Sequence, residues 1–238
     1  WQDGEIYVIE VNPRASRTVP FVSKAIGVSL AKVAAKVMMG KTLEEVGFTD
    51  EIIPKHFSVK ESVFPFNKFQ GVDPILSPEM KSTGEVMGTG DTFGEAFGKA
   101  SLGASADIPT SGNVIISVRD TDKPFIVDIA KRLKALGFNL LATTGTAATL
   151  KEAGLEVNIA NKVHEGRPHM VDMIKNDEIT FIINTTEGRK SIESSAEIRR
   201  SALQHKVFYT TTFAAAEASV LAIEFGENTT VRRLQDFH

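Results

Sequence analysis

The second half of the chain alternates short apolar runs with segments of helical pattern, and this alternation limits the fold more than any other feature. Strands are predicted at residues 114–118, 138–142, 157–160, 180–183 and 207–209. Helices are predicted at residues 124–136, before Gly154, and at 168–176, 191–204 and 212–225. Near-continuous apolar strands joined by helices are typical of a parallel sheet covered on both faces. The sequence therefore predicts an α/β fold with a doubly wound parallel five-stranded sheet.

The first half of the chain lacks this regularity. β-Forming residues at 6–9 precede Pro13, which predicts the end of a strand that runs into a bend. Apolar residues at helical spacing predict a helix over residues 29–39, and residues 42–48 are expected to add a short helical turn.

Between these elements and the sheet lies a segment rich in Pro, Gly and Phe, which reads as irregular apart from one helix over residues 92–102. We therefore expect three parts: residues 1–50, a connecting segment at 51–109, and a sheet domain at 110–238.

Composition narrows the class of partner. The net charge of −3 leaves no basic excess to neutralise nucleic-acid phosphates. The chain has no cysteine, which excludes disulfides and thiolate chemistry and fits a reducing cytoplasm. No apolar run approaches the ~20 residues that span a bilayer. The opening W-Q-D-G-E lacks the features of a signal peptide and resembles a cut within a longer polypeptide. We expect a cytoplasmic protein that binds neither nucleic acid nor membrane.

The run I-E-V-N-P-R-A-S-R suggests a metal and phosphate site. Glu10 and Asn12 are two positions apart, so in an extended segment their side chains point the same way. A carboxylate and an amide oxygen are ligands suited to Mg²⁺, which often completes its shell with substrate phosphates. The guanidinium of Arg14 could grip such a phosphate. An ordinary polar strand end is the alternative.

Polar residues also follow every predicted strand of the sheet. In a doubly wound sheet, ligands bind beyond the carboxyl ends of the strands, where the strand order reverses. The residues at these ends are Ser117 with Lys123, the run Thr143–Thr144–Gly145–Thr146, Asn161 with Lys162, Asn184 to Arg189, and Thr210 to Thr212. Hydroxyls and helix-start N–H groups beside two lysines favour a phosphorylated small molecule.

Two other groups of residues have simpler interpretations. His164, Glu165 and His169 could suggest a metal site, but Pro168 breaks their spacing, so a loop framing the phosphate pocket is favoured. The pair Arg199–Arg200 lies on a predicted helix and is expected to face solvent.

The run E-V-N-P-R-A-S-R-T-V-P-F-V-S-K-A-I-G-V-S-L-A-K-V-A resembles the end of the second ATP-grasp unit in the carbamoyl phosphate synthetase large-subunit family. The resemblance implies that Glu10 and Asn12 are metal ligands and that Arg14 and Arg17 lie on the phosphate side of the ATP. It also implies Mg²⁺ or Mn²⁺ with ATP in a full-length parent. The fragment itself is expected to need no cofactor and to be inactive alone, without catalytic residues of its own.

Several short segments resemble the methylglyoxal-synthase-like domain that closes the same subunit. They are S-V-R, T-G-T, N-K-V-H-E-G-R-P-H, I-I-N-T-T and R-R-S-A-L-Q. In that family the domain is regulatory, with a nucleotide monophosphate in its phosphate pocket and, in some members, ornithine at a second site. The implied nucleotide residues are Ser117, Lys123, Thr143, Gly145, Thr146, Lys162, Asn184, Thr185 and Thr186. The implied amino-acid effector residues are Glu61, Leu76, Tyr209 and Thr211.

Together the two resemblances cover essentially the whole chain in the right order. They imply the C-terminal part of an ATP-dependent ligase that makes carbamoyl phosphate for pyrimidine and arginine biosynthesis. UMP, IMP and ornithine would be effectors, a small glutaminase subunit a partner, and the parent an oligomer. A free-standing methylglyoxal-synthase-like enzyme, a cyclohydrolase-type enzyme of purine synthesis and a structural module are the alternatives. The first would need a histidine in the N-T-T-E-G-R loop, which has none, and the second would not carry E-V-N-P-R.

Overall fold

The computed structural model describes residues 2–68, 72–75, 81–82, 84–187, 192–193, 195–226 and 231–238. The chain divides into two compact units, one of residues 1–55 with 231–238 and one of residues 56–230. Each is described by itself. No helix within the described residues is both long enough and apolar enough to cross a membrane.

The first unit consists of short helices with little core. Its helices are α1 (Thr18–Ile26), α2 (Leu30–Met38) and α3 (Leu43–Val46), with a 3-10 turn, η3 (Leu234–Phe237). The predicted helices at 29–39 and 42–48 are confirmed by α2 and α3, whereas α1 was not predicted. α3 begins with a capping box, in which Thr42 and Glu45 each accept the other's backbone N–H.

The strand predicted at residues 6–9 is wrong. The segment is extended but belongs to no strand, and Ile6 and Ile9 are 84% and 96% exposed. β-Forming residues define a strand only when a neighbouring strand takes up their backbone hydrogen bonds, and the described residues offer none here.

The second unit begins with a β-hairpin where the sequence suggested irregular structure. β1 (Phe57–Val63) pairs antiparallel with β2 (Gly84–Gly90), and α4 (Phe93–Gly103) follows. α4 confirms the helix predicted at 92–102. It packs so closely on β2 that a side chain at Gly88 would overlap the backbone of Ala96.

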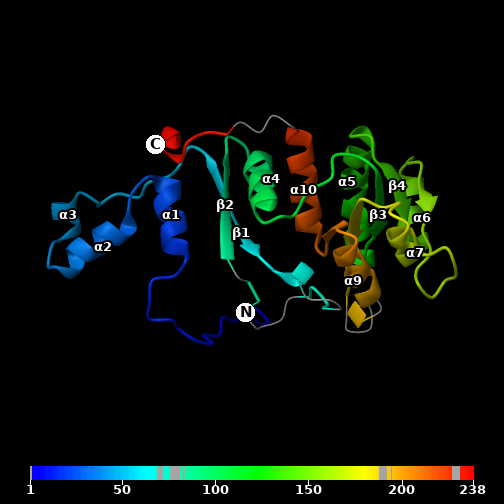
Figure 1. Cartoon of the computed structure of the whole chain (residues 1–238), viewed down its shortest axis with the longest axis horizontal. Coiled ribbons are helices and arrows are strands. Elements are labelled where there is room, and N and C mark those ends of the chain that lie inside the picture. Colours follow the sequence, from blue (N-terminus) through cyan, green and yellow to red (C-terminus); the bar gives the residue numbers. More distant parts are fainter. Residues whose placement is uncertain are drawn as a thin grey trace. The chain divides into compact units, whose positions relative to one another are not determined.

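The rest of this unit is the predicted five-stranded sheet (Figure 1). Its strands are β3 (Asn113–Ser117), β4 (Asn139–Ala142), β5 (Asn158–Ile159), β6 (Phe181–Asn184) and β7 (Phe208–Thr210). All neighbours are parallel, in the order β5-β4-β3-β6-β7. The order reverses between the adjacent central strands β3 and β6, so the doubly wound fold is confirmed.

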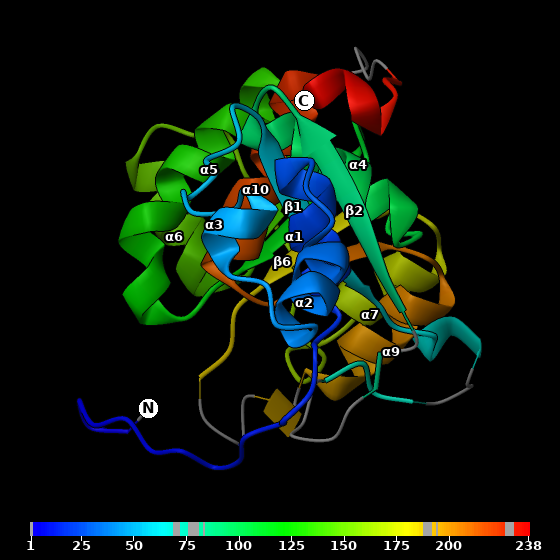
Figure 2. The ribbon, with the colours of Figure 1, turned by 90° about the vertical axis from the view of Figure 1, so that its left-hand side faces the viewer.

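Helices cover both faces of the sheet. They are α5 (Lys123–Ala135), α6 (Thr144–Glu152), α7 (Met170–Lys175), α9 (Ala196–Gln204) and α10 (Phe213–Phe225). Successive residues of β3 enter opposite cores: Ile116 packs with α5, α6 and α10, while Ile115 packs with α7 and α9. Figure 2 shows α5 and α6 on one side and α7 and α9 on the other. This alternation explains why the strands read as continuous apolar runs.

Candidate functional site

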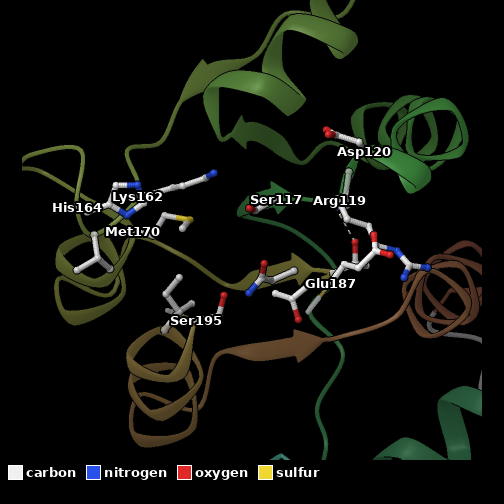
Figure 3. A pocket seen from close by; sticks show the side chains of 14 residues that line it. Ser117, Arg119, Asp120, Lys162, His164, Met170, Glu187 and Ser195 are labelled. Carbon is white, nitrogen blue, oxygen red and sulfur yellow. Dashed lines mark hydrogen bonds between the residues drawn. The ribbon is translucent and has the colours of Figure 1, made fainter. Parts of the chain in front are cut away.

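A pocket of about 360 Å³ opens beyond the carboxyl ends of β3 and β6, where the strand order reverses (Figure 3). Its lining comes from the ends of β3 and β6, the loops after β3, β5 and β6, and the starts of α7 and α9. The lining residues are Ser117, Val118, Arg119, Asp120, Lys162, Val163, His164, Met170, Asn184, Thr185, Thr186, Glu187, Ser195 and Ile198. Five of the nine predicted nucleotide residues are among them: Ser117, Lys162, Asn184, Thr185 and Thr186.

Buried hydroxyls hold the loop after β3 in place. Thr146 Oγ1 accepts the Val118 N–H at 3.3 Å, and Thr185 Oγ1 accepts the Arg119 N–H at 3.1 Å. Thr143 Oγ1 donates to Ser117 Oγ at 3.3 Å. Thr143 and Thr146 are buried and do not line the pocket, so the structure gives them a supporting position beneath Ser117.

Two lysines lower the pKa of one carboxylate, that of Asp120 in the loop after β3. Lys123 Nζ lies 2.7 Å from Asp120 Oδ1. This contact with Lys123, followed by the charge of Lys162, holds the pKa of Asp120 below its ordinary value. Lys123 Nζ also lies 3.0 Å from the point that a side chain on Gly145 would occupy, so glycine there leaves room for the ammonium. An anion arriving here would find two positive charges and could replace the exposed Asp120 carboxylate.

The pocket also contains polar residues that the strand-end pattern of the sequence did not include, Arg119, Asp120 and Ser195, together with Glu187 from the run after β6. Arg119 Nε donates to Asp122 Oδ2 at 2.9 Å, and this bond raises the pKa of Arg119. Figure 3 shows Lys162 and His164 on one wall of the pocket and Arg119 and Glu187 across from them. Arg119 and Asp120 come one residue after the end of β3, a position from which the strand-end rule could have found them.

The two histidines of the H-E-G-R-P-H run have different positions. His164 lines the pocket, which agrees with the prediction that this loop frames it. His169 is buried and caps α7, where its Nδ1 accepts the Asp172 N–H at 3.2 Å.

Arg199 corrects the prediction of a solvated basic face. It is only 4% exposed, and its guanidinium donates to both carboxylate oxygens of Asp73, from Nε at 2.8 Å and from Nη2 at 2.6 Å. Arg200 is exposed, as predicted. The sequence of this helix does not reveal which of its two adjacent arginines packs against Asp73, which lies 126 residues earlier in the chain.

The described amino-acid effector residues lie on separate elements, Glu61 on β1 and the other two on or after β7. Glu61 lies half-buried on β1, where burial raises its pKa, and no hydrogen bond joins it to Tyr209 or Thr211 in the described part of the chain. Tyr209 lies in β7, and Thr211 follows that strand in an exposed position. Leu76 lies outside the described residues.

The predicted ATP-side residues belong to the first unit. Asn12 Nδ2 donates to Glu10 Oε1 at 3.2 Å, so the two side chains lie together as the sequence predicted. Arg14 and Arg17 are exposed, and Arg17 immediately precedes α1.

Comparisons with known proteins match both parts of the chain. The family model of the MGS-like domain matches residues 125–211. The model of the carbamoyl-phosphate synthase L chain ATP binding domain matches residues 1–46.

Curated relatives match the whole chain. A carbamoyl phosphate synthase large chain of Pseudomonas putida is 67% identical over 237 residues, and one of Vibrio cholerae is 57% identical over 237 residues. Each alignment includes 100% of this chain, which spans 22% of the relative's length. A solved methylglyoxal synthase from Elizabethkingia anophelis is 18% identical, with a TM-score of 0.40 over 48% of this chain and 80% of that one.

Proposed function

Because the chain is related over its whole length to the C-terminal part of carbamoyl phosphate synthase large chains, we propose that its five-stranded sheet binds a regulatory nucleoside monophosphate. The single observation that carries this is the pair of lysines at the pocket: Lys123 contacts the Asp120 carboxylate, and Lys162, which lines the pocket, lowers the pKa of the same carboxylate by its charge. Two ammonium groups near one acid leave net positive charge for a phosphate.

The phosphate would bind between the two lysines and take the place of the Asp120 carboxylate at Lys123. Asp120 is suited to this exchange, because its side chain is 93% exposed and loses little on rehydration. The base would lie over the apolar part of the lining, Val163, Met170 and Ile198. The supporting hydroxyls of Thr143, Thr146 and Thr185 would keep the loop after β3 in its binding geometry.

In the full-length parent we propose that occupancy of this pocket shifts the population of conformations that synthesise carbamoyl phosphate from bicarbonate, glutamine-derived ammonia and ATP. The parent would work in the cytoplasm as an oligomer with a small glutaminase subunit, for pyrimidine and arginine biosynthesis. UMP and IMP are the proposed nucleotide effectors.

Glu10 and Asn12 fit the metal of the parent's ATP site. Their side chains are adjacent and together offer carboxylate and amide oxygens, the donor type that Mg²⁺ or Mn²⁺ takes in proteins. The metal would neutralise charge on the ATP phosphates, with Arg14 and Arg17 on the phosphate side.

Ornithine is the proposed amino-acid effector, and Glu61 is the residue that best supports it. A half-buried carboxyl whose pKa is raised by burial gains from a cationic ligand, because an ammonium group offsets the desolvation. Tyr209, Thr211 and Leu76 are proposed to complete that site.

The sharpest test of nucleotide binding is the variant Lys162→Ala, studied by titration calorimetry with UMP and IMP. We expect affinity to fall roughly tenfold or more, since one charge-assisted hydrogen bond to the phosphate is lost. Lys151→Ala is the matched control, because Lys151 is an exposed lysine of α6 that does not line the pocket. Equal affinities in the two variants would place the phosphate elsewhere.

The same material separates the alternatives. Asp120 and His164 both line the pocket, as an acid and base acting on a small phosphorylated substrate would. Methylglyoxal formed from dihydroxyacetone phosphate would favour a free-standing synthase. Heat from none of UMP, IMP and ornithine would favour a structural module.

A further inference from the structure

Asn184 lines the pocket, but one end of its amide is already committed. The residue closes β6, beside β7, and its Nδ2 donates to Tyr209 Oη at 2.8 Å. Asn184 is 4% exposed, so its remaining polar atom has few partners to choose from. With one N–H of this nitrogen given to Tyr209, Oδ1 is the acceptor that the amide offers to a ligand.

The Tyr209 hydroxyl is itself next to a buried positive charge. Tyr209 of β7 packs against the core cluster that contains Ile198 and Ala202 of α9, the helix that carries Arg199. The hydrogen bond from Asn184 and the charge of Arg199 oppose the rise in the Tyr209 pKa that burial causes. A neighbouring cation favours the arrangement in which the hydroxyl presents its oxygen to the guanidinium and its hydrogen elsewhere. That arrangement leaves an oxygen lone pair to accept the Asn184 N–H.

Arg199 is fixed well enough to exert this influence. Its side chain is 3% exposed, forms a two-bond fork with Asp73, and also donates from Nη2 to the Ile192 carbonyl at 3.0 Å. Its helix carries the pocket residues Ser195 and Ile198 at or near its start. Arg199 does not line the pocket itself, and the hydrogen bond between Tyr209 and Asn184 gives it a route to a bound ligand.

We propose that Arg199 is a positioning residue, which acts through Tyr209 to keep the Asn184 amide oxygen turned toward the pocket as an acceptor for a ligand hydroxyl. Without the cation, the tyrosine hydroxyl is free to donate to Asn184, and the amide turns its NH₂ toward the ligand instead. This inference rests on the proposed nucleotide site and assigns Asn184 to the ribose hydroxyls of the nucleotide.

The test compares two nucleotides in three proteins by calorimetry: UMP and 2′,3′-dideoxyuridine monophosphate, with the unaltered chain, Arg199→Gln and Arg200→Gln. The unaltered chain and Arg200→Gln should prefer UMP roughly tenfold, because the analogue leaves a buried acceptor unpaired. Arg199→Gln should lose most of that preference. Arg200 is the matched control, since it is the adjacent arginine of the same helix and faces solvent. An undiminished preference in Arg199→Gln overturns the proposal.

Two further measurements keep the test decisive. If Arg199→Gln does not fold, Tyr209→Phe removes only the hydroxyl, and an unchanged preference for UMP in that variant overturns the proposal. If the unaltered chain binds no nucleotide, the proposed function fails. The NMR signals of the Asn184 side-chain amide then decide the positioning role without ligand. They should shift in Tyr209→Phe and stay in place in Arg200→Gln, and unshifted signals in Tyr209→Phe overturn it.

Discussion

Glu61 and Arg199 are charged side chains that the fold withdraws from water, and they differ in what compensates them. Arg199 meets the Asp73 carboxylate in a two-bond fork, which lowers the pKa of Asp73 and raises that of Arg199. Glu61 has no such counter-charge among the described residues, and burial alone raises its pKa. A buried carboxylate without a counter-charge lowers the stability of the fold. Such groups are common at binding sites, where a ligand supplies the missing charge.

Glu61→Gln is therefore expected to stabilise the chain at pH 7, by less than about 1 kcal/mol because solvent still screens a half-buried group. A carboxyl with a raised folded-state pKa binds its proton more tightly in the folded chain. Its contribution is thus most favourable at low pH and is lost as the pH rises from the ordinary value of 4.5 through the raised value.

Urea unfolding at pH 7 and at pH 4 measures this effect, and the gain from Glu61→Gln should shrink at pH 4. Glu85→Gln is the control, because Glu85 lies on the neighbouring strand and pairs with Lys60 at 3.5 Å, so its loss should not stabilise. A less stable Glu61→Gln at pH 7 would contradict the prediction.

At the scale of elements, glycines allow the hairpin, α4 and α10 to pack with their backbones close together. α4 and α10 lie side by side in Figure 1 and contact each other along their lengths. A side chain at Gly94 would overlap the carbonyl oxygen of Leu221 in α10, whereas one at Gly98 would lie 3.4 Å from Ala222 Cβ, an ordinary contact. Glycine inside a helix is ordinarily unfavourable, yet Gly94 is what α4 needs in order to pack on α10.

The two glycines should respond oppositely to the same substitution. Gly94→Ala should destabilise the chain by about 2 kcal/mol, because backbone must move to make room. Gly98→Ala should be neutral or stabilise by about 0.5 kcal/mol, because alanine restricts the unfolded chain and favours a helix. Urea midpoints of the two variants provide the comparison. Equal losses would mean that the α4–α10 packing is looser than described.

At the scale of the whole molecule, the residues proposed for ATP and those proposed for the nucleotide effector belong to different units. Glu10, Asn12, Arg14 and Arg17 lie in the unit of residues 1–55 and 231–238, in which Ala25 is the only buried apolar residue among those described. The sheet and its pocket lie wholly in the unit of residues 56–230. The proposed nucleotide site is therefore built from residues of the larger unit.

We expect the chain by itself to turn over no ATP in the presence of Mg²⁺. Glu10 and Asn12 sit in an exposed segment without a strand partner among the described residues, so little holds them in a metal-binding geometry. A coupled assay of ADP release measures this, with a full-length carbamoyl phosphate synthase as the positive control. Turnover that Glu10→Gln abolishes would show that the segment works as a site on its own.

The sequence by itself determined the layout of the sheet domain, because each strand and helix there is encoded locally. Apolar runs, helical periodicity and stop signals such as Gly137 placed all five strands to within about two residues, and their alternation fixed the parallel fold. It also located Ser117, Lys162 and Asn184 at a common edge, because the carboxyl ends of parallel strands lie at the same edge of a sheet whatever their side chains are.

Only the tertiary structure decided the rest, because it depends on contacts between residues far apart in the chain. The strand expected at 6–9 lacks a partner, and the hairpin of β1 and β2 forms within a segment that reads as irregular. Burial of Arg199 against Asp73, 126 residues away, likewise has no local signature. Periodicity reports which face of an element is apolar, but the partner of a polar group is set by what the fold brings beside it.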